Sequence, residues 1–264
     1  MPVSLLNMMK NNIKIIINCL FTLSVFSQVT VYAQQLSATE IVRKADEKFN
    51  GESSGFSIMT MTVIRPSWQR SIEFKSWSMG RDYSLALITA PAREKGQSFL
   101  KRKSEMWCWN PAISRLIKLP PSMMSQGWMG SDYTNDDILR ESSVINDYTH
   151  EIEKLETIDG RECYKIILTA KENAGILWSR QIWWVDTKEF IVIRTELYDE
   201  DGYLARTEKA SEMKVFDGRM LPSVIELVPA DNEGYKTILT IKEMKFNTAT
   251  DESFFSQQNM KSVR

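Results

Sequence analysis

Hydrophobic residues alternate with polar residues along most of the chain after Gly55. Met59, Met61 and Val63 alternate with threonines, and the same period of two returns at 70–75 and 83–87. Successive side chains of a β-strand point to opposite faces, so this pattern predicts strands that turn one face toward a core.

A different spacing precedes the strands. Ser37-Ala38-Thr39-Glu40 has the pattern of a capping box, in which Ser37 caps a helix and Glu40 reaches back to it. Ile41, Ala45 and Phe49 then recur at helical spacing, and Gly51 is a typical end residue. The sequence therefore predicts one helix that lays an apolar face on a sheet.

Turn sequences divide the second half of the chain. Asp-Gly pairs stand at 159–160, 201–202 and 217–218, and Asn232-Glu233-Gly234 marks a fourth turn. Asp-Gly between alternating segments favours a hairpin, because the turn requires positive φ angles. The predicted strands are 161–170, 180–185, 190–198, 204–215, 221–228 and 235–247. Consecutive hairpins of this kind form an antiparallel meander.

The fold predicted from these elements is mainly β. A sheet of roughly ten or more strands twists too strongly to stay flat, so it curls and encloses space. We expect a part-open antiparallel barrel with a cavity, together with the N-terminal helix and a short helical insert near 136–142. Residues 34–264 are interpreted as a single domain.

The N-terminus has the pattern of a secretory signal peptide. Lys10 and Lys14 precede an apolar run at 15–31, and Val31-Tyr32-Ala33 matches a cleavage site with small residues. A membrane anchor is the alternative, although the run barely approaches the ~20 apolar residues that a spanning helix needs. We predict cleavage near Ala33 and export of the mature protein. Export permits a disulfide between Cys108 and Cys163, but two separate buried thiols are favoured.

The residues that could carry chemistry are few. The net charge of −1 offers no basic surface for nucleic acid, and His150 is the only histidine, which argues against a zinc site. No nucleophile elbow or P-loop sequence is present. Asp132, Asp136 and Asp137 lack the spacing of a calcium loop and are interpreted as helix caps or as a docking point for a partner. Neither enzymatic activity nor a metal or other cofactor is predicted.

Large apolar side chains provide the positive signal. We predict that a hydrophobic cavity is lined by Met59, Met61, Phe99, Trp107, Trp109 and Trp184. The alternative for each of these residues is an ordinary place in the core. Flexible methionines suit a surface that adapts to varied apolar shapes. We therefore assign the mouth or lid of the cavity to Met123, Met124, Trp128 and Met129.

One segment carries a resemblance to a known family. It runs from Trp107-Cys108-Trp109-Asn110-Pro111 through 115–121 to the acidic end of 128–137. This segment closely resembles the outer membrane lipoprotein-sorting proteins, which are LolA-like periplasmic proteins often encoded beside RND-type or MMPL-like exporters. The resemblance implies a curved antiparallel half-barrel in the periplasm, with the N-terminal helix and the short helical insert covering its open face. Its hydrophobic cavity is expected to hold acyl chains of lipids or lipoproteins while they cross an aqueous compartment.

The resemblance also implies partners. These are an inner-membrane exporter of the RND or MMPL type and an acceptor at the outer membrane, and we expect the protein itself to be a monomer. The alternative function is that of a lipid-sensing or structural accessory subunit of such an exporter, without carrier activity.

Overall fold

The computed structural model describes residues 36–264, apart from 51–52, 136, 138–142 and 173–175. The chain divides into two units, Met1–Leu36 and Ser37–Arg264. The predicted signal peptide lies outside the described residues, and so does all of the predicted insert helix except Asp137. None of the described helices combines the length and hydropathy that crossing a membrane requires.

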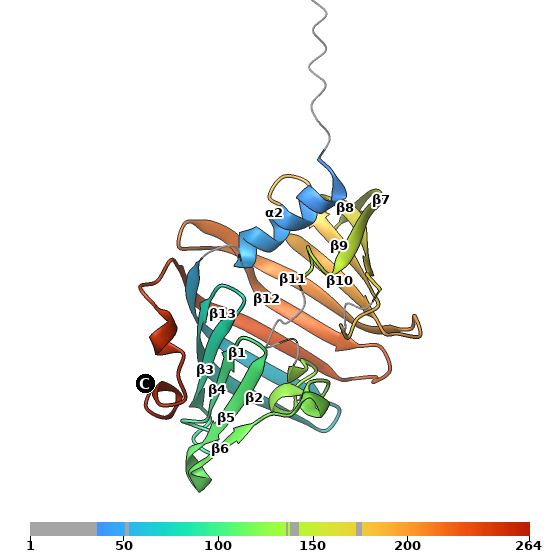
Figure 1. The fold of residues 1–264 in the computed structure, drawn as a ribbon. Helices are drawn as coiled ribbons and strands as arrows, with labels where there is room; N and C mark the ends of the chain where they lie inside the picture. The colour runs from blue at the N-terminus through green and yellow to red at the C-terminus, as the bar shows by residue number, and fades with distance from the viewer. Residues whose placement is uncertain (1–35, 51–52, 136, 138–142, 173–175) are drawn as a thin grey trace, which may run out of the picture. The chain divides into compact units, whose positions relative to one another are not determined.

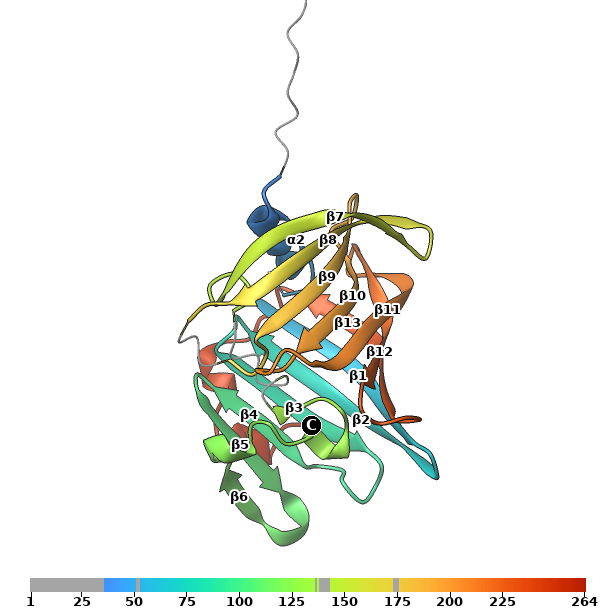
Figure 2. The same cartoon turned by 90° about the vertical axis from the view of Figure 1, so that its right-hand side faces the viewer.

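The second unit is built on one curved, open, antiparallel sheet of thirteen strands (Figures 1 and 2). The strands are β1 (Ser54–Arg65), β2 (Trp68–Met79), β3 (Tyr83–Ala90), β4 (Ser98–Arg102), β5 (Glu105–Asn110), β6 (Arg115–Lys118), β7 (Tyr148–Ile158), β8 (Arg161–Ala170), β9 (Arg180–Asp186), β10 (Val192–Tyr198), β11 (Leu204–Phe216), β12 (Arg219–Pro229) and β13 (Lys236–Phe246). They lie in the order β6-β5-β4-β3-β2-β1-β13-β12-β11-β10-β9-β8-β7. Two meanders are therefore joined where β1 pairs with β13. The predicted curved half-barrel is confirmed.

The predicted helix is α2 (Ala38–Asn50), and its capping box forms. The Glu40 N–H donates to Ser37 Oγ at 3.2 Å, and the Ser37 N–H donates to Glu40 Oε2 at 2.9 Å. Ile41 and Val42 are fully buried, and the helix contacts β7 and β9. The sequence spacing thus gave both the start of this helix and its apolar face.

Two Asp-Gly hairpins take the expected geometry. Asp159 and Gly160, between β7 and β8, have φ angles of 49° and 77°. Asp217 and Gly218, between β11 and β12, have φ angles of 46° and 81°. Positive φ at both central positions gives the backbone the twist of the flanking strands, which sets the register of each hairpin.

One face of the sheet, here called the inner face, runs without interruption across both meanders. Met61 on β1 pairs with Leu239 on β13, Leu239 pairs with Ile225 on β12, and Ile225 pairs with Ala210 on β11. Directly opposed residues share a face, so these side chains form one continuous apolar strip. Residues 119–135 together with Asp137, here called the insert, cover the part of this face over β1–β5, and α2 lies beside its other part.

The opposite face of β2–β5 is also covered, which the sequence did not reveal. Tyr83, Leu85, Leu100 and Trp107 form a buried cluster with side chains of the C-terminal segment 252–263. That segment contributes Phe254, Phe255, Met260 and Val263. Both faces of this part of the sheet are therefore buried.

This arrangement corrects the predicted position of Trp107 and Trp109. On β5 they alternate with Met106 and Cys108, which lie against the inner-face cluster. Trp107 and Trp109 instead pack in the cluster covered by the C-terminal segment. They consequently do not share a surface with Met59, Met61 and Phe99.

The two described cysteines are free thiols in different clusters. Cys108 packs against the inner-face cluster beneath the insert, and Cys163 is fully buried with Ile182 and Trp184. Burial raises the pKa of the Cys163 thiol to about 11, and the Asp186 carboxylate adds to this effect. The favoured expectation of two separate thiols agrees with this arrangement.

The C-terminal segment makes a testable contribution to stability. Phe255 is fully buried, with its ring centroid 5.7 Å from that of Tyr83. Phe255→Ala should lower the free energy of unfolding by about 3–5 kcal/mol, because it removes buried surface and leaves a cavity. Urea unfolding followed by circular dichroism measures this change.

Tyr203→Ala is the control, since Tyr203 is 73% exposed and its loss should change stability by less than about 0.5 kcal/mol. Equal shifts of the unfolding midpoint in the two variants would contradict the packing described for the C-terminal segment.

Candidate ligand-binding cavity

The insert fills the inner face over β1–β5 with one large side chain. Trp128, in η3 (Trp128–Gly130), is only 1% exposed. Its ring lies edge-on to Phe74 and Phe99, with centroids 5.3 Å away in each case. Its indole Nε1–H is buried and has no hydrogen-bond partner among the described residues. Trp128, which was predicted to be part of a lid, thus inserts into the core like a plug. Its buried N–H group has no acceptor there.

Two glycines allow the chain to turn around Trp128. A Cβ on Gly127 would lie 2.5 Å from the backbone oxygen of Ser131, and Gly130 has a φ angle of 75°. Met129 between them also takes a left-handed conformation, and the Ser131 hydroxyl donates to the Trp128 carbonyl oxygen at 2.7 Å. The glycines are therefore required by the shape of this turn.

Two arginine–carboxylate pairs fasten the insert to the sheet. Asp132 accepts two hydrogen bonds from Arg65 at the end of β1, both at 3.0 Å, and one from the Thr237 hydroxyl on β13 at 2.7 Å. Asp137 accepts two from Arg206 on β11, at 2.6 and 2.8 Å. Paired hydrogen bonds of this kind fix both distance and orientation. The insert is thus held by strands from both meanders.

Asp137 also exchanges hydrogen bonds with Thr134 in the pattern of a capping box, and its role as a helix cap stays a prediction. The Thr134 N–H donates to Asp137 Oδ2 at 2.7 Å, and the Asp137 N–H donates to Thr134 Oγ1 at 3.1 Å. Asp132 forms an ion pair and its carboxylate caps no helix among the described residues, and Asp136 lies outside them. Burial opposes ionisation of Asp137, but the hydrogen bonds and charge of Arg206 outweigh it and hold the pKa of Asp137 below its ordinary value. The pair is therefore ionised over the physiological range.

A cavity remains open on the other part of the inner face. It measures about 190 Å³ and lies between α2 and strands β9–β12. Its apolar lining consists of Ala45, Phe49, Trp183, Ile191, Val192, Ile193, Ala210, Leu221, Pro222 and Ile225. Asp46, Lys48, Arg194, Thr195 and Glu208 contribute polar groups. The lining has the composition of a small-molecule site, whereas the volume is below the ~300–1,000 Å³ usual for such sites.

Three of the predicted cavity residues lie on the inner face, but beneath the insert. Met61 and Phe99 are buried with Trp128, and Met59 packs against this cluster. Met59 also packs against the cluster of Phe216, Leu221 and Ile241, and Leu221 lines the open cavity. Met59 therefore connects the space that the insert fills with the space that remains open.

Trp184 is not in the cavity. Its indole Nε1–H donates to Glu156 Oε2 at 2.9 Å, and its ring lies between Lys165 and Arg194, 5.4 and 5.0 Å from the centroid. Its neighbour Trp183 lines the cavity instead. Alternation along β9 places the two tryptophans on opposite faces, and the sequence alone does not tell which face is inner.

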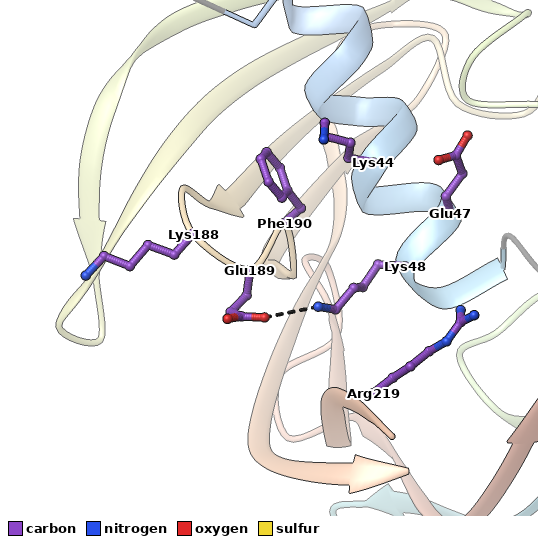
Figure 3. Close-up of a pocket in the computed structure, with 7 residues that line it drawn as sticks. All are labelled: Lys44, Glu47, Lys48, Lys188, Glu189, Phe190 and Arg219. Atoms are coloured by element: carbon purple, nitrogen blue, oxygen red, sulfur yellow. Dashed lines mark hydrogen bonds and ion pairs between the residues drawn. The ribbon is translucent and has the colours of Figure 1, made fainter. Parts of the chain in front are cut away.

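A second cavity, of about 430 Å³, lies beside α2 and was not predicted (Figure 3). Here called the basic cavity, it is lined by Lys44, Glu47, Lys48, Lys188, Glu189, Phe190 and Arg219. These residues come from α2, from the turn between β9 and β10, and from the first position of β12. Lys48 lines both cavities, so the apolar and basic cavities adjoin.

Metal-binding and histidine chemistry have little support in this site. The described residues contain no group of three or more His, Cys, Asp or Glu side chains that could hold a metal ion. His150 lies 3.1 Å from the Thr39 hydroxyl through Nδ1 and 2.7 Å from the Val144 carbonyl oxygen through Nε2. This histidine links the start of α2 to β7, and a structural role accounts for it.

Comparisons with known proteins agree with this geometry. A family model described as "-like: Uncharacterized protein" matches residues 80–262. The chain is similar to a LolA superfamily protein from Nitrosomonas europaea, with 25% identity and a TM-score of 0.72 over 84% of this chain and 99% of that one. A DUF1329 family protein from Desulfovibrio piger gives 22% identity and a TM-score of 0.76 over 84% and 97%.

A third solved structure is similar over the same extent. An outer membrane lipoprotein-sorting protein domain from Vibrio parahaemolyticus gives 20% identity and a TM-score of 0.74, over 85% of this chain and 98% of that domain. No curated protein matches the sequence.

The tether between Arg206 and Asp137 can be tested by substitution. Arg206→Leu should lower the free energy of unfolding by about 3–5 kcal/mol, because it leaves the buried Asp137 carboxylate without its counter-ion. Arg206→Leu combined with Asp137→Leu should restore much of that loss, since the buried carboxylate is removed with its counter-ion and Glu208, the other ion-pair partner of Arg206 at 3.1 Å, is partly exposed. Urea unfolding of the single and double variants measures both effects.

Lys236→Leu is the matched control, because Lys236 pairs with Glu226 at 2.9 Å in a solvent-exposed position on the same sheet. Its loss should cost no more than about 1 kcal/mol. A double variant no more stable than Arg206→Leu alone would show that the pair does not act as a unit.

Proposed function

Because the chain belongs to the LolA-like family of outer membrane lipoprotein-sorting proteins, we propose that it binds acyl chains and carries them through the periplasm toward the outer membrane. The cargo is a lipid or a lipid-modified protein. The carrier has no enzymatic activity, receives its cargo from an inner-membrane exporter of the RND or MMPL type, and delivers it to an acceptor at the outer membrane. The N-terminal signal peptide directs it to that compartment and is removed near Ala33.

The observation that carries this proposal is the apolar cavity between α2 and β9–β12. Each methylene moved from water into such a site gains about 0.8 kcal/mol, so an acyl chain in solution strongly favours it. A carrier also needs a polar exterior, and Lys165 and Glu156 supply part of one beside Trp184, on the face opposite to Trp183.

The size of the cavity gives the insert a role. At about 190 Å³ the open space holds part of a long acyl chain, and the adjoining inner face is occupied by Trp128. Uptake of a complete chain therefore requires Trp128 to leave its site between Phe74 and Phe99. In this proposal the mouth of the cavity is formed by Met123, Met124, Trp128 and Met129. The space for the acyl chain runs from the open cavity, past Met59, to the site that the Trp128 ring occupies.

The filled inner face favours one alternative, a structural accessory subunit of an exporter. Such a protein keeps Trp128 in place and binds no lipid. Mass spectrometry of an organic extract of the protein, purified from its native compartment, separates the two functions. The carrier yields bound lipid, and the accessory subunit yields none.

Filling the open cavity should abolish binding. Ala210 lies on the cavity wall and is half-buried. Ala210→Phe adds a ring where the acyl chain would lie, so the affinity for a fluorescent fatty-acid probe should fall by about tenfold or more, the equivalent of about 1.4 kcal/mol. Fluorescence titration of the intact protein measures this affinity.

Ala112→Phe is the matched control, because Ala112 is exposed in η1 (Pro111–Ile113), far from α2 in the fold. Unchanged binding by Ala210→Phe, with the protein folded, would show that the acyl chain does not use this cavity.

Removing the plug should extend the cavity. Trp128→Ala should lower stability by about 3–5 kcal/mol, because a large buried ring is lost. The same change opens space next to Met59. In the parent protein, affinity should stop rising with fatty-acid chain length once the cavity is full, and in Trp128→Ala it should keep rising to longer chains. Titration with a series of saturated fatty acids compares the two proteins. An identical chain-length limit in both would contradict a continuous inner space.

A further inference from the structure

The basic cavity adjoins the apolar one along α2. Lys48 lines both, and Phe190 of the basic cavity directly precedes Ile191 of the apolar cavity. A molecule that occupied the two together would meet hydrocarbon walls at one end and ammonium and guanidinium groups at the other. Such a molecule is an amphiphile.

The cations of the basic cavity are held in defined positions. The Lys44 ammonium lies 5.0 Å from the centroid of the Phe190 ring, and the Arg219 guanidinium lies 4.2 Å from that of Phe246. An aromatic face orders a cation without cancelling its charge. Lys44 makes no ion pair with any acid in the described part of the chain. Its positive charge is therefore available to a ligand.

Lys48 is the cation that connects the two cavities. It forms an ion pair with Glu189 at 3.0 Å, and the glutamate side chain is 45% exposed (Figure 3). An exposed pair of this kind is worth at most about 1 kcal/mol, so a ligand anion can replace Glu189 at little cost. Lys188 extends away from the other cations in this view and is not needed.

We propose that the basic cavity binds the anionic headgroup, a phosphate or a carboxylate, of an amphiphile whose acyl chain lies in the adjoining apolar cavity. This inference rests on the proposed carrier function and specifies its cargo. Without Lys188, the lining residues include three cations and two acids, which leaves a formal charge of +1 for a headgroup to meet. Lys44, Lys48 and Arg219 supply the charge-assisted hydrogen bonds.

Lys48 also lies in the last turn of α2, where cations stabilise a helix through its dipole. That role alone affects the stability of the helix but not the choice of ligand. The deciding measurement is therefore binding, with stability recorded separately by thermal unfolding.

The experiment compares three probes on the intact protein by isothermal titration below the micelle concentration. Dodecyl phosphate has both chain and charge, monododecanoylglycerol has the chain alone, and inorganic phosphate has the charge alone. We expect dodecyl phosphate to bind at least about tenfold more tightly than either of the others, because charge-assisted hydrogen bonds add to burial of the chain. Its affinity should fall with added salt, and that of the uncharged probe should not.

Three variants locate the charge effect. Lys48→Gln and Arg219→Gln should each weaken dodecyl phosphate binding by about three- to tenfold and leave monododecanoylglycerol binding unchanged. Lys44→Gln serves in place of Arg219→Gln if that variant does not fold. Lys118→Gln is the matched control. Lys118 lies on β6, at the end of the sheet opposite to β7, and it forms an exposed ion pair with Glu105 of β5.

The outcomes separate this inference from the carrier function. Equal affinity for the two dodecyl probes, or an equal loss in Lys118→Gln, overturns the headgroup site and leaves the carrier function standing. Inorganic phosphate that binds as tightly as dodecyl phosphate shows a site for a free anion, which also overturns the proposal. If neither dodecyl probe binds, the carrier function fails with it.

Discussion

The pairing of β1 with β13 is the constraint on which the rest of the structure depends. It joins two meanders that the sequence order would otherwise leave separate, and it brings Met59 opposite Ile241 and Met61 opposite Leu239. The inner face is continuous only because of this seam. The same seam places Arg65 near Thr237, and together these two residues bind Asp132 of the insert. A pairing so distant in the chain forms only after a large loop closes, and it decides both the curvature of the sheet and the position of its cover.

An open sheet of this size presents more apolar surface than it can bury against itself. Three separate segments of the chain cover the remaining apolar surface. The insert covers the inner face over β1–β5, α2 lies over β7 and β9, and the C-terminal segment covers the opposite face of β2–β5. The covers differ in how they are held. The C-terminal segment and α2 are held mainly by apolar packing, whereas the insert is also held by two ion pairs with buried arginines. Buried pairs add little net stability compared with apolar contacts, but they strongly penalise any position in which one charge loses its partner. The insert consequently has one well-defined closed position.

The sequence predicted the elements better than it predicted their faces. Alternation and Asp-Gly turns were sufficient for the strands, the meanders and the half-barrel, because both are local signals with a direct geometric cause. Alternation shows only that a strand has two different faces, and it does not tell which segment of the chain covers each face. On β5 both faces are buried, so the size and hydrophobicity of Trp107 and Trp109 gave no indication that the C-terminal segment, and not the insert, covers them. Trp183 and Trp184 present the same ambiguity on β9. The basic cavity could not be found from the sequence, because Lys44, Glu189 and Arg219 come from three separate elements and each is unremarkable in its own segment.

Trp128 links the closed structure to the function proposed for it. Its ring is buried between two phenylalanines, yet its N–H finds no acceptor among the described residues. An unsatisfied buried donor costs about 1–3 kcal/mol, and this cost is recovered when the indole reaches water. An acyl chain that takes the place of the ring replaces one apolar surface with another and leaves no donor unsatisfied. In the proposed carrier, part of the free energy needed to move the insert would therefore already be present in this structure. The remainder, set by the Arg65 and Arg206 ion pairs, would determine how strongly a ligand must bind to displace the insert.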